Sequence, residues 1–275
     1  MSINKENKSQ PEQFGLFDDL PTSTAHQSRL QLFQPTRRPI ATVRTIETIW
    51  GSAVVHGKIG QAHADVMEAI FKVAHDHQIK DDGGMQILVD PYKVRITAGG
   101  GKALGGSQLD KVITELMQVV IELRIKATDT KIKGHILDRA VESKVKADTY
   151  ARTSFGAEDR KMWCVEIPRT FVQLFYTDHG LYYDPQPIAA LSTGIGQAIA
   201  RHVATHSQQP RGGWSLDGLI KAVGAGETSI DMRNRRREVL KDQDGLSALG
   251  LVIEDGRVKR SRNKQPTPPE ATQGV

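Results

Sequence analysis

The C-terminal part of the chain carries the pattern that most constrains its fold. A helical pattern over 191–206 is followed by a second one that ends at Gly224, and after a tight turn a third one begins at Thr228. Two short strand patterns then flank Asp255-Gly256, a dipeptide that favours a two-residue hairpin turn. Helix, helix, tight turn, helix and hairpin is the order of a winged helix-turn-helix, in which the hairpin is the wing.

The third helical pattern has two unlike faces. At about 100° per residue, Met232, Val239 and Leu246 fall on one apolar stripe. The opposite face is polar and basic, and it consists of Arg233, Asn234, Arg237 and Lys241, with Arg236 at its border. Like charges this close repel one another, whereas phosphates or guanine edges remove the repulsion and offer bidentate partners to arginine. We predict that this face contacts DNA; the alternative is a solvated charged face.

The predicted hairpin adds positive charge next to this helix. Its second strand carries Arg257, Lys259 and Arg260, and Arg262 follows. We expect Arg257, Lys259 and Arg260 to hold phosphates beside the groove that the helix enters. Two basic elements on one winged helix favour a DNA-binding surface over a merely solvated one.

The first half of the chain repeats the same order with a longer turn. Its elements are strand patterns over 43–50, 53–57, 85–89 and 119–127, helical patterns over 60–77 and 107–118, a short helix that begins at Asp90-Pro91, and a glycine-rich loop over 99–106. The outward face of the second long helix is polar and consists of Ser107, Gln108, Lys111 and Thr114. Such residues suit base-edge or water-mediated contacts, and they suit an ordinary surface equally well. As a DNA-reading face they would enter a second groove, one helical turn away.

Together these patterns predict an α+β protein with two tandem winged-helix domains. We expect the domains over 37–128 and 129–262, a polar, disordered arm over 1–36 and a short disordered tail over 263–275. The chain has 275 residues and a formal net charge of +5, which favours polyanionic partners where the charge is clustered.

Several classes of protein are disfavoured by what the sequence lacks. The single cysteine, Cys164, allows no intramolecular disulfide and no Cys-rich zinc site, and it reads as a small core residue. The N-terminal residues lack the apolar stretch of a secretory signal, and no run reaches the ~18 apolar residues of a membrane span. We therefore expect a cytoplasmic protein that does not contact membranes.

Three segments resemble the replication initiators of theta-type plasmids, in particular the TrfA-like and IncQ RepC-like proteins. These segments are Met232 to Leu251, Gly105 to Arg124 and Leu191 to His206. The resemblance implies tandem winged helices that bind directly repeated origin sequences, called iterons, as a monomer. It also implies opening of an AT-rich region, recruitment of the host initiator DnaA and the helicase DnaB, and a homodimer that is inactive in initiation. The long glycine-rich turn departs from some relatives and puts the geometry of the first recognition helix in doubt.

The N-terminal arm contains a candidate peptide for the bacterial sliding clamp. Gln13, Leu16 and Phe17 match a QxxLF pattern that TrfA-like initiators also carry, and an exposed Leu-Phe pair in a polar arm calls for a partner. A second candidate spans residues 27–32. The alternative is that these apolar residues dock on the first domain or on a second subunit.

No catalytic, metal or cofactor site is predicted. The segment GGGK is not a phosphate-binding loop, because Ile96 stands where the motif requires glycine and Ala103 where it requires Ser or Thr. The histidines show no three-ligand spacing, and without a metal-binding histidine pair Tyr182-Tyr183 make a poor nucleophile site. Two rival functions stay open: a winged-helix transcription regulator and a DNA-nicking rolling-circle initiator.

Overall fold

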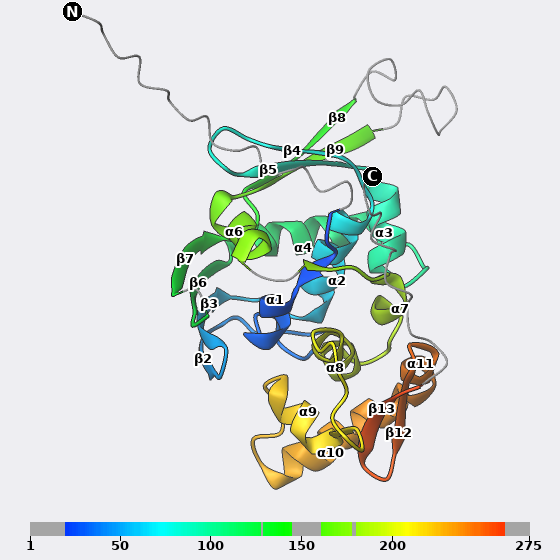
Figure 1. Cartoon of the computed structure of the whole chain (residues 1–275). Coiled ribbons are helices and arrows are strands. Elements are labelled where there is room, and N and C mark those ends of the chain that lie inside the picture. Colours follow the sequence, from blue (N-terminus) through cyan, green and yellow to red (C-terminus); the bar gives the residue numbers. More distant parts are fainter. Residues whose placement is uncertain (1–19, 128, 145–160, 178–179, 262–275) are drawn as a thin grey trace, which may run out of the picture.

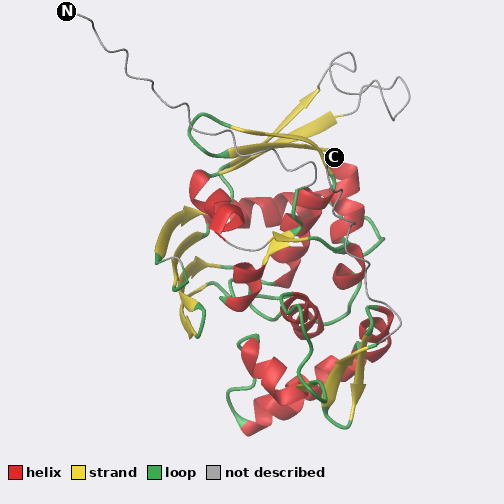
Figure 2. Ribbon diagram, viewed as in Figure 1, coloured by secondary structure: helices red, strands yellow, loops and turns green. Residues whose placement is uncertain are grey.

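The computed structural model describes residues 20–127, 129–144, 161–177 and 180–261 (Figure 1). It is an α+β structure, as the sequence predicts, and helices and strands are interleaved along it (Figure 2). The buried apolar side chains form two clusters, one from Leu30 to Phe175 and the other from Ile188 to Val258. We call the parts of the chain around these clusters the first and the second unit.

The second unit is a winged helix. Its elements are α8 (Gly194–Ala204), β11 (Trp214–Ser215), α9 (Leu216–Ala222), α10 (Ser229–Lys241), α11 (Gln243–Ala248), β12 (Leu251–Glu254) and β13 (Arg257–Arg260). Strand β13 lies between β11 and β12 and pairs antiparallel with both. Helices α9 and α10 form the helix-turn-helix, and β12 and β13 form the wing, in the order that the sequence predicts.

Side-chain caps explain where these helices begin. The hydroxyl of Thr228 accepts a hydrogen bond from the backbone N–H of Asp231 and starts α10, and Ser215 starts α9 in the same way. The turn between the two helices contains Gly224 and Gly226, both at φ +79°, a conformation that L side chains rarely adopt. Two glycines therefore allow the turn, and two hydroxyl side chains determine where the helices begin.

The Arg-rich helix is shorter than the predicted apolar stripe. Helix α10 ends at Lys241, and the buried Asp242 separates it from α11. Met232, Val239 and Leu246 are nevertheless all buried in the core of the second unit. The stripe is thus correct, but it is carried by two helices with a change of direction between them.

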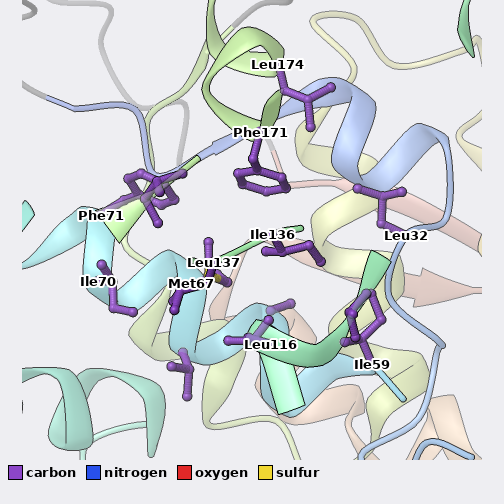
Figure 3. Close-up of a cluster of buried hydrophobic side chains, with 14 of the residues drawn as sticks. Leu32, Ile59, Met67, Ile70, Phe71, Leu116, Ile136, Leu137, Phe171 and Leu174 are labelled. Atoms are coloured by element: carbon purple, nitrogen blue, oxygen red, sulfur yellow. The ribbon is translucent and has the colours of Figure 1, made fainter. Parts of the chain in front are cut away.

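The first unit repeats the same order and adds strands to it. Its helices are α2 (Gln61–Lys72), α3 (Pro91–Ala98), α4 (Gly106–Gln118) and α6 (Arg169–Thr177). One sheet has the order β2 (Thr42–Thr48), β3 (Gly51–Gly57), β6 (Val120–Ile125), β7 (Thr130–His135). The other has the order β4 (Ala74–Ile79), β5 (Met85–Val89), β9 (Lys161–Ile167), β8 (Arg139–Lys144). Helices α2 and α4 carry core side chains such as Met67 and Leu116 (Figure 3).

Two sequence-based boundaries are wrong in the first unit. The predicted helix over 60–77 stops at Lys72, because the next residues form β4 and pair with β5. The domain boundary between 128 and 129 cuts through one core, since β6 pairs with β7 and the apolar cluster continues to Phe175. Pairing between distant strands overrides the local helical pattern and extends the first unit.

Residues 20–36 are ordered, which corrects the prediction of disorder for this part of the arm. Strand β1 (Ser23–Thr24) pairs with β10 (Gly180–Leu181), and α1 (Ala25–Arg29) follows it. Leu30, Leu32 and Phe33 are buried in the first core, which also contains Phe171 and Leu174 (Figure 3). The second clamp candidate, residues 27–32, is therefore part of the packed protein, whereas Gln13, Leu16 and Phe17 lie outside the described residues. A short helix, α7 (Gln186–Ala189), leads into the second unit.

Candidate nucleic-acid interface

The outer face of α10 presents unpaired cations. Arg233, Asn234, Arg237 and Lys241 are exposed, and among the described residues no hydrogen bond or ion pair engages their charged or polar side-chain groups. Arg235 differs from them, because its guanidinium binds Asp231 at 3.1 Å and Glu238 at 2.9 Å on the same helix. The helix face that the sequence predicts to enter a DNA groove is thus the face whose cations are not neutralised by other described residues.

Arg236 is held by a partner on the preceding helix. Its Nε donates to Oδ1 of Asp217 on α9 at 2.6 Å, and its Nη2 donates to Oδ2 of the same carboxylate. This hydrogen bond lowers the pKa of Asp217 and raises that of Arg236. The bidentate pair joins the two helices of the helix-turn-helix, so Arg236 positions α10 instead of offering a free charge.

One arginine of the wing is held by hydrogen bonds within the protein. The guanidinium of Arg260 donates to the backbone carbonyls of Val203 at 2.8 Å, Ser207 at 3.3 Å and His206, and it lies over the ring of Trp214. Burial lowers the pKa of Arg260. Since these carbonyls follow or end α8, Arg260 anchors the wing to the body of the unit.

Arg257 and Lys259 are the wing cations that remain near solvent. Arg257 is exposed and donates only a long hydrogen bond of 3.3 Å to the carbonyl of Gly213. Lys259 forms an exposed ion pair with Glu254 at 2.9 Å, which contributes little because water screens it. Both can exchange these contacts for phosphates, whereas Arg262 lies outside the described residues.

Helix α4 presents the predicted polar face. Ser107, Gln108, Lys111 and Thr114 are exposed, and the inward residues Leu109, Val112, Ile113 and Leu116 are buried. The Thr114 hydroxyl donates to the carbonyl of Asp110 at 2.8 Å, which leaves its oxygen as an acceptor. The four residues are therefore accessible together on one side of the helix.

A buried histidine ties α4 to α2. The backbone N–H of Gly60 donates to Nδ1 of His63, so the ring proton is on Nε2, which donates to Glu115 at 2.8 Å. Burial raises the pKa of Glu115, but hydrogen bonds from Lys58 and His63 outweigh burial and lower it. The charged carboxylate of Glu115, one turn after Lys111, ties α4 to α2 beside the exposed polar face.

The sequence reasoning missed the hairpin that follows α4. Strands β6 and β7 carry Arg124, Lys131 and Lys133, Lys126 directly follows β6, and this hairpin takes the place of a wing in the first unit. Lys133 pairs with Glu122 at 2.6 Å and Arg124 with Asp129 at 3.2 Å, whereas Lys131 is exposed and has no such partner among the described residues. The sequence shows basic residues at alternate positions in or next to both strands, but the predicted domain boundary between residues 128 and 129 separates the two strands.

Similarity to known proteins is visible in the fold but not in the sequence. No protein-family model and no curated protein matches the chain. A crystal structure of selenomethionine derivatives of domain 2 and domain 3 of RctB matches it with a TM-score of 0.53. The chain has the fold of these two domains. The match covers 86% of this chain and 96% of that chain at 12% sequence identity.

A second crystal structure of RctB domains 2-3 has a TM-score of 0.46 at 13% identity, over 85% of this chain and 94% of the other. The match to the first structure confirms the predicted α+β, winged-helix architecture. Identities this low show a shared fold and leave the function of each residue to be argued from its geometry.

Two further observations concern the described residues alone. None of their helices combines the length and the apolar character needed to cross a membrane. Their His, Cys, Asp and Glu side chains do not gather anywhere in groups of three or more that could hold a metal ion.

Proposed function

We propose that this protein initiates DNA replication by binding directly repeated origin sequences through its two winged-helix units. The observation that carries the proposal is a row of cations on α10, the second helix of a helix-turn-helix, beside a wing with further cations. None of the cations in this row has a partner in the described ranges. The architecture agrees with it, since the chain shares the fold of domains 2 and 3 of RctB, with two helix-turn-helix units in tandem. The resemblance to TrfA-like and RepC-like proteins adds the finer proposal of a plasmid initiator that binds iterons.

In this proposal each unit reads one groove. Arg233, Asn234, Arg237 and Lys241 of α10 enter one major groove, and Arg257 and Lys259 hold adjacent phosphates. Arg236 and Arg260 position these elements from within the protein. Ser107, Gln108, Lys111 and Thr114 of α4 read a second groove one helical turn away.

The proposed partners follow from the same resemblance. DnaA and the helicase DnaB would be recruited to the opened origin, and Gln13, Leu16 and Phe17 would dock in the sliding clamp. A homodimer would be the form that is inactive in initiation. We propose a cytoplasmic protein without enzymatic activity, cofactor or membrane partner.

Selection from random DNA duplexes tests the proposal. An asymmetric site bound by a monomer, whose affinity falls steeply with salt, supports a two-unit initiator and identifies the repeat to search for. A palindromic site bound by a stable dimer would instead indicate a transcription regulator. Metal-dependent nicking that leaves protein on the 5′ end would indicate a rolling-circle initiator, and no enrichment at all would refute specific DNA binding.

A further inference from the structure

A buried ionic cluster joins the two units through α2 and α8. Arg201 of α8 is only 5% exposed, and its Nη2 donates to Asp65 at 2.7 Å and to Glu68 at 2.8 Å. Its Nε donates to the other oxygen of Glu68 at 2.8 Å, and its Nη1 donates to Gln61 at 2.8 Å. All three partners belong to α2, so one guanidinium bridges the first helix of one winged helix to the first helix of the other.

Other side chains complete the cluster. Gln197, one turn before Arg201 on α8, donates to Asp65 at 3.2 Å and to the carbonyl of Ala189 at 3.2 Å. The Tyr183 hydroxyl donates to Glu68 at 2.6 Å, and Arg37 lies 4.0 Å from Asp65. Two arginines therefore face two carboxylates, and each carboxylate has further hydrogen-bond donors.

Such a cluster specifies geometry more than it adds stability. Removing charged groups from water costs several kcal/mol per ion by typical values, so a buried ion pair contributes about as much as, or less than, apolar packing of the same volume. Apolar surfaces can slide over one another, whereas a planar guanidinium that donates to three side chains fits in one orientation. Only one relative placement of α2 and α8 satisfies all these hydrogen bonds.

The cluster is the middle link of a chain of polar contacts between the two DNA-reading helices. At one end, Glu115 of α4 accepts from His63 of α2. At the other end, Asp242 at the end of α10 accepts from Ser192 and Thr193 at the start of α8. Figure 1 shows α8 between α2 and the pair α9 and α10. Each recognition helix is thus fixed to the helix of its own unit that enters the cluster.

We infer that Arg201 is a positioning residue that sets the distance and rotation between α4 and α10, and that it thereby selects the spacing between the two parts of the DNA site. The inference rests on the proposed function, because it requires that both helices read DNA. One inserted base pair moves the two parts by about 3.4 Å and rotates them by about 35°, which a rigid protein cannot follow.

The test compares a site of selected spacing with versions that carry one or two extra base pairs between its parts. The wild-type protein should lose about 10- to 100-fold in affinity on insertion, the cost of losing one or two specific contacts. Arg201→Lys keeps the charge but offers at most three donors on one nitrogen, in place of the planar guanidinium that donates four hydrogen bonds. Glu68→Gln weakens the two hydrogen bonds that Arg201 donates to this side chain. The affinity of both variants for the inserted sites should stay within about threefold of their affinity for the original site, because a loosened junction lets both helices reach their grooves.

A control variant separates this role from general stability. Ile87→Ala removes a fully buried, apolar side chain from β5 in the first core, which takes part in none of the cluster's hydrogen bonds, and should keep the wild-type spacing penalty. Equal spacing penalties in Arg201→Lys, Glu68→Gln and the wild type, with unchanged circular dichroism, would overturn this inference alone. A wild-type protein that selects no two-part site would overturn the proposed function and this inference with it.

A second measurement needs no DNA and covers variants that bind too weakly. Spin labels at Asp110→Cys on α4 and Leu240→Cys on α10, in a Cys164→Ser background, report the distance between the two helices. We expect one narrow distance distribution for the otherwise unchanged chain and a broader one for Tyr183→Phe and Arg201→Lys. Distributions of equal width would show that the cluster does not fix the two units.

Discussion

Asp242 accepts hydrogen bonds from both the backbone N–H and the hydroxyl of Thr193, which joins the end of the Arg-rich helix α10 to the start of α8. The other carboxylate oxygen of Asp242 accepts from the N–H and the hydroxyl of Ser192, at 2.7 and 2.6 Å. The carboxylate is buried, while Thr193 is half-buried and Ser192 is exposed. The direction in which α10 leaves the core is therefore set by one side chain.

Asp242→Ala should destabilise the protein by about 1.5–3 kcal/mol, because it removes the charge-assisted hydrogen bonds that join the end of α10 to the start of α8. Urea unfolding followed by circular dichroism measures the loss. The matched control is Asp244→Ala on α11, whose side chain is exposed and whose removal should cost less than about 0.5 kcal/mol. Equal stabilities of the two variants would contradict the role of Asp242.

Arg237→Ala tests the DNA-contacting face of α10. We expect the binding free energy to weaken by about 1–3 kcal/mol if Arg237 contacts a base. If it contacts a phosphate, the salt slope, that is the slope of log affinity against log salt concentration, should fall in magnitude by about one. Fluorescence anisotropy at several salt concentrations distinguishes the two. Arg235→Ala is the control on the same helix, because its guanidinium is engaged by Asp231 and Glu238 and should contribute less. If affinity and slope both stay at the wild-type values in Arg237→Ala, α10 is not the recognition helix.

Much of the second unit could be predicted from local sequence signals. The Thr228 cap, the glycine turn and Asp255-Gly256 act through the chain's own backbone within a few residues, and the structure has all three. What could not be predicted depends on partners far along the chain. Arg201 reads as a cation near a helix end, yet its carboxylate partners precede it by 133 and 136 residues. Arg260 likewise reads as a wing cation, and only the fold shows that backbone carbonyls of another segment hold it.

The stability of the sheet β4-β5-β9-β8 should depend on pH in the acid range. The Arg139 guanidinium, with help from Gln86 and Lys80, holds the pKa of Glu166 at about 2, below the ordinary 4.5. A folded-state pKa below the unfolded value stabilises the protein above pH 4.5, and the contribution is lost as pH falls from 4.5 toward 2. The difference in unfolding free energy between wild type and Glu166→Gln should therefore shrink over this range. Glu47→Gln, at an exposed position on β2, should show no comparable change.

The clamp peptide can be tested separately from DNA binding. Leu16→Ala with Phe17→Ala should abolish binding of the full-length chain to purified sliding clamp in calorimetry, because the two side chains would fill the apolar pocket. The affinity for DNA should not change, since Gln13, Leu16 and Phe17 are not among the residues proposed to contact DNA. Gln10→Ala serves as the control outside the motif. Undiminished clamp binding by the double variant would place the contact elsewhere in the chain.

The hairpin β6–β7 offers a test of DNA contact by the first unit. Lys131 is exposed and forms no ion pair within the part of the chain that the structure describes. Lys131→Ala should therefore lower the salt slope of binding by about one if the lysine neutralises a phosphate. Lys133→Ala should change the slope less, because Lys133 is already paired with Glu122 at 2.6 Å. A slope that is unchanged in Lys131→Ala would mean that this hairpin lies away from the DNA. Because the hairpin β6–β7 follows α4 directly, that outcome would also weaken the assignment of the exposed α4 residues to a second groove. These residues are Ser107, Gln108, Lys111 and Thr114.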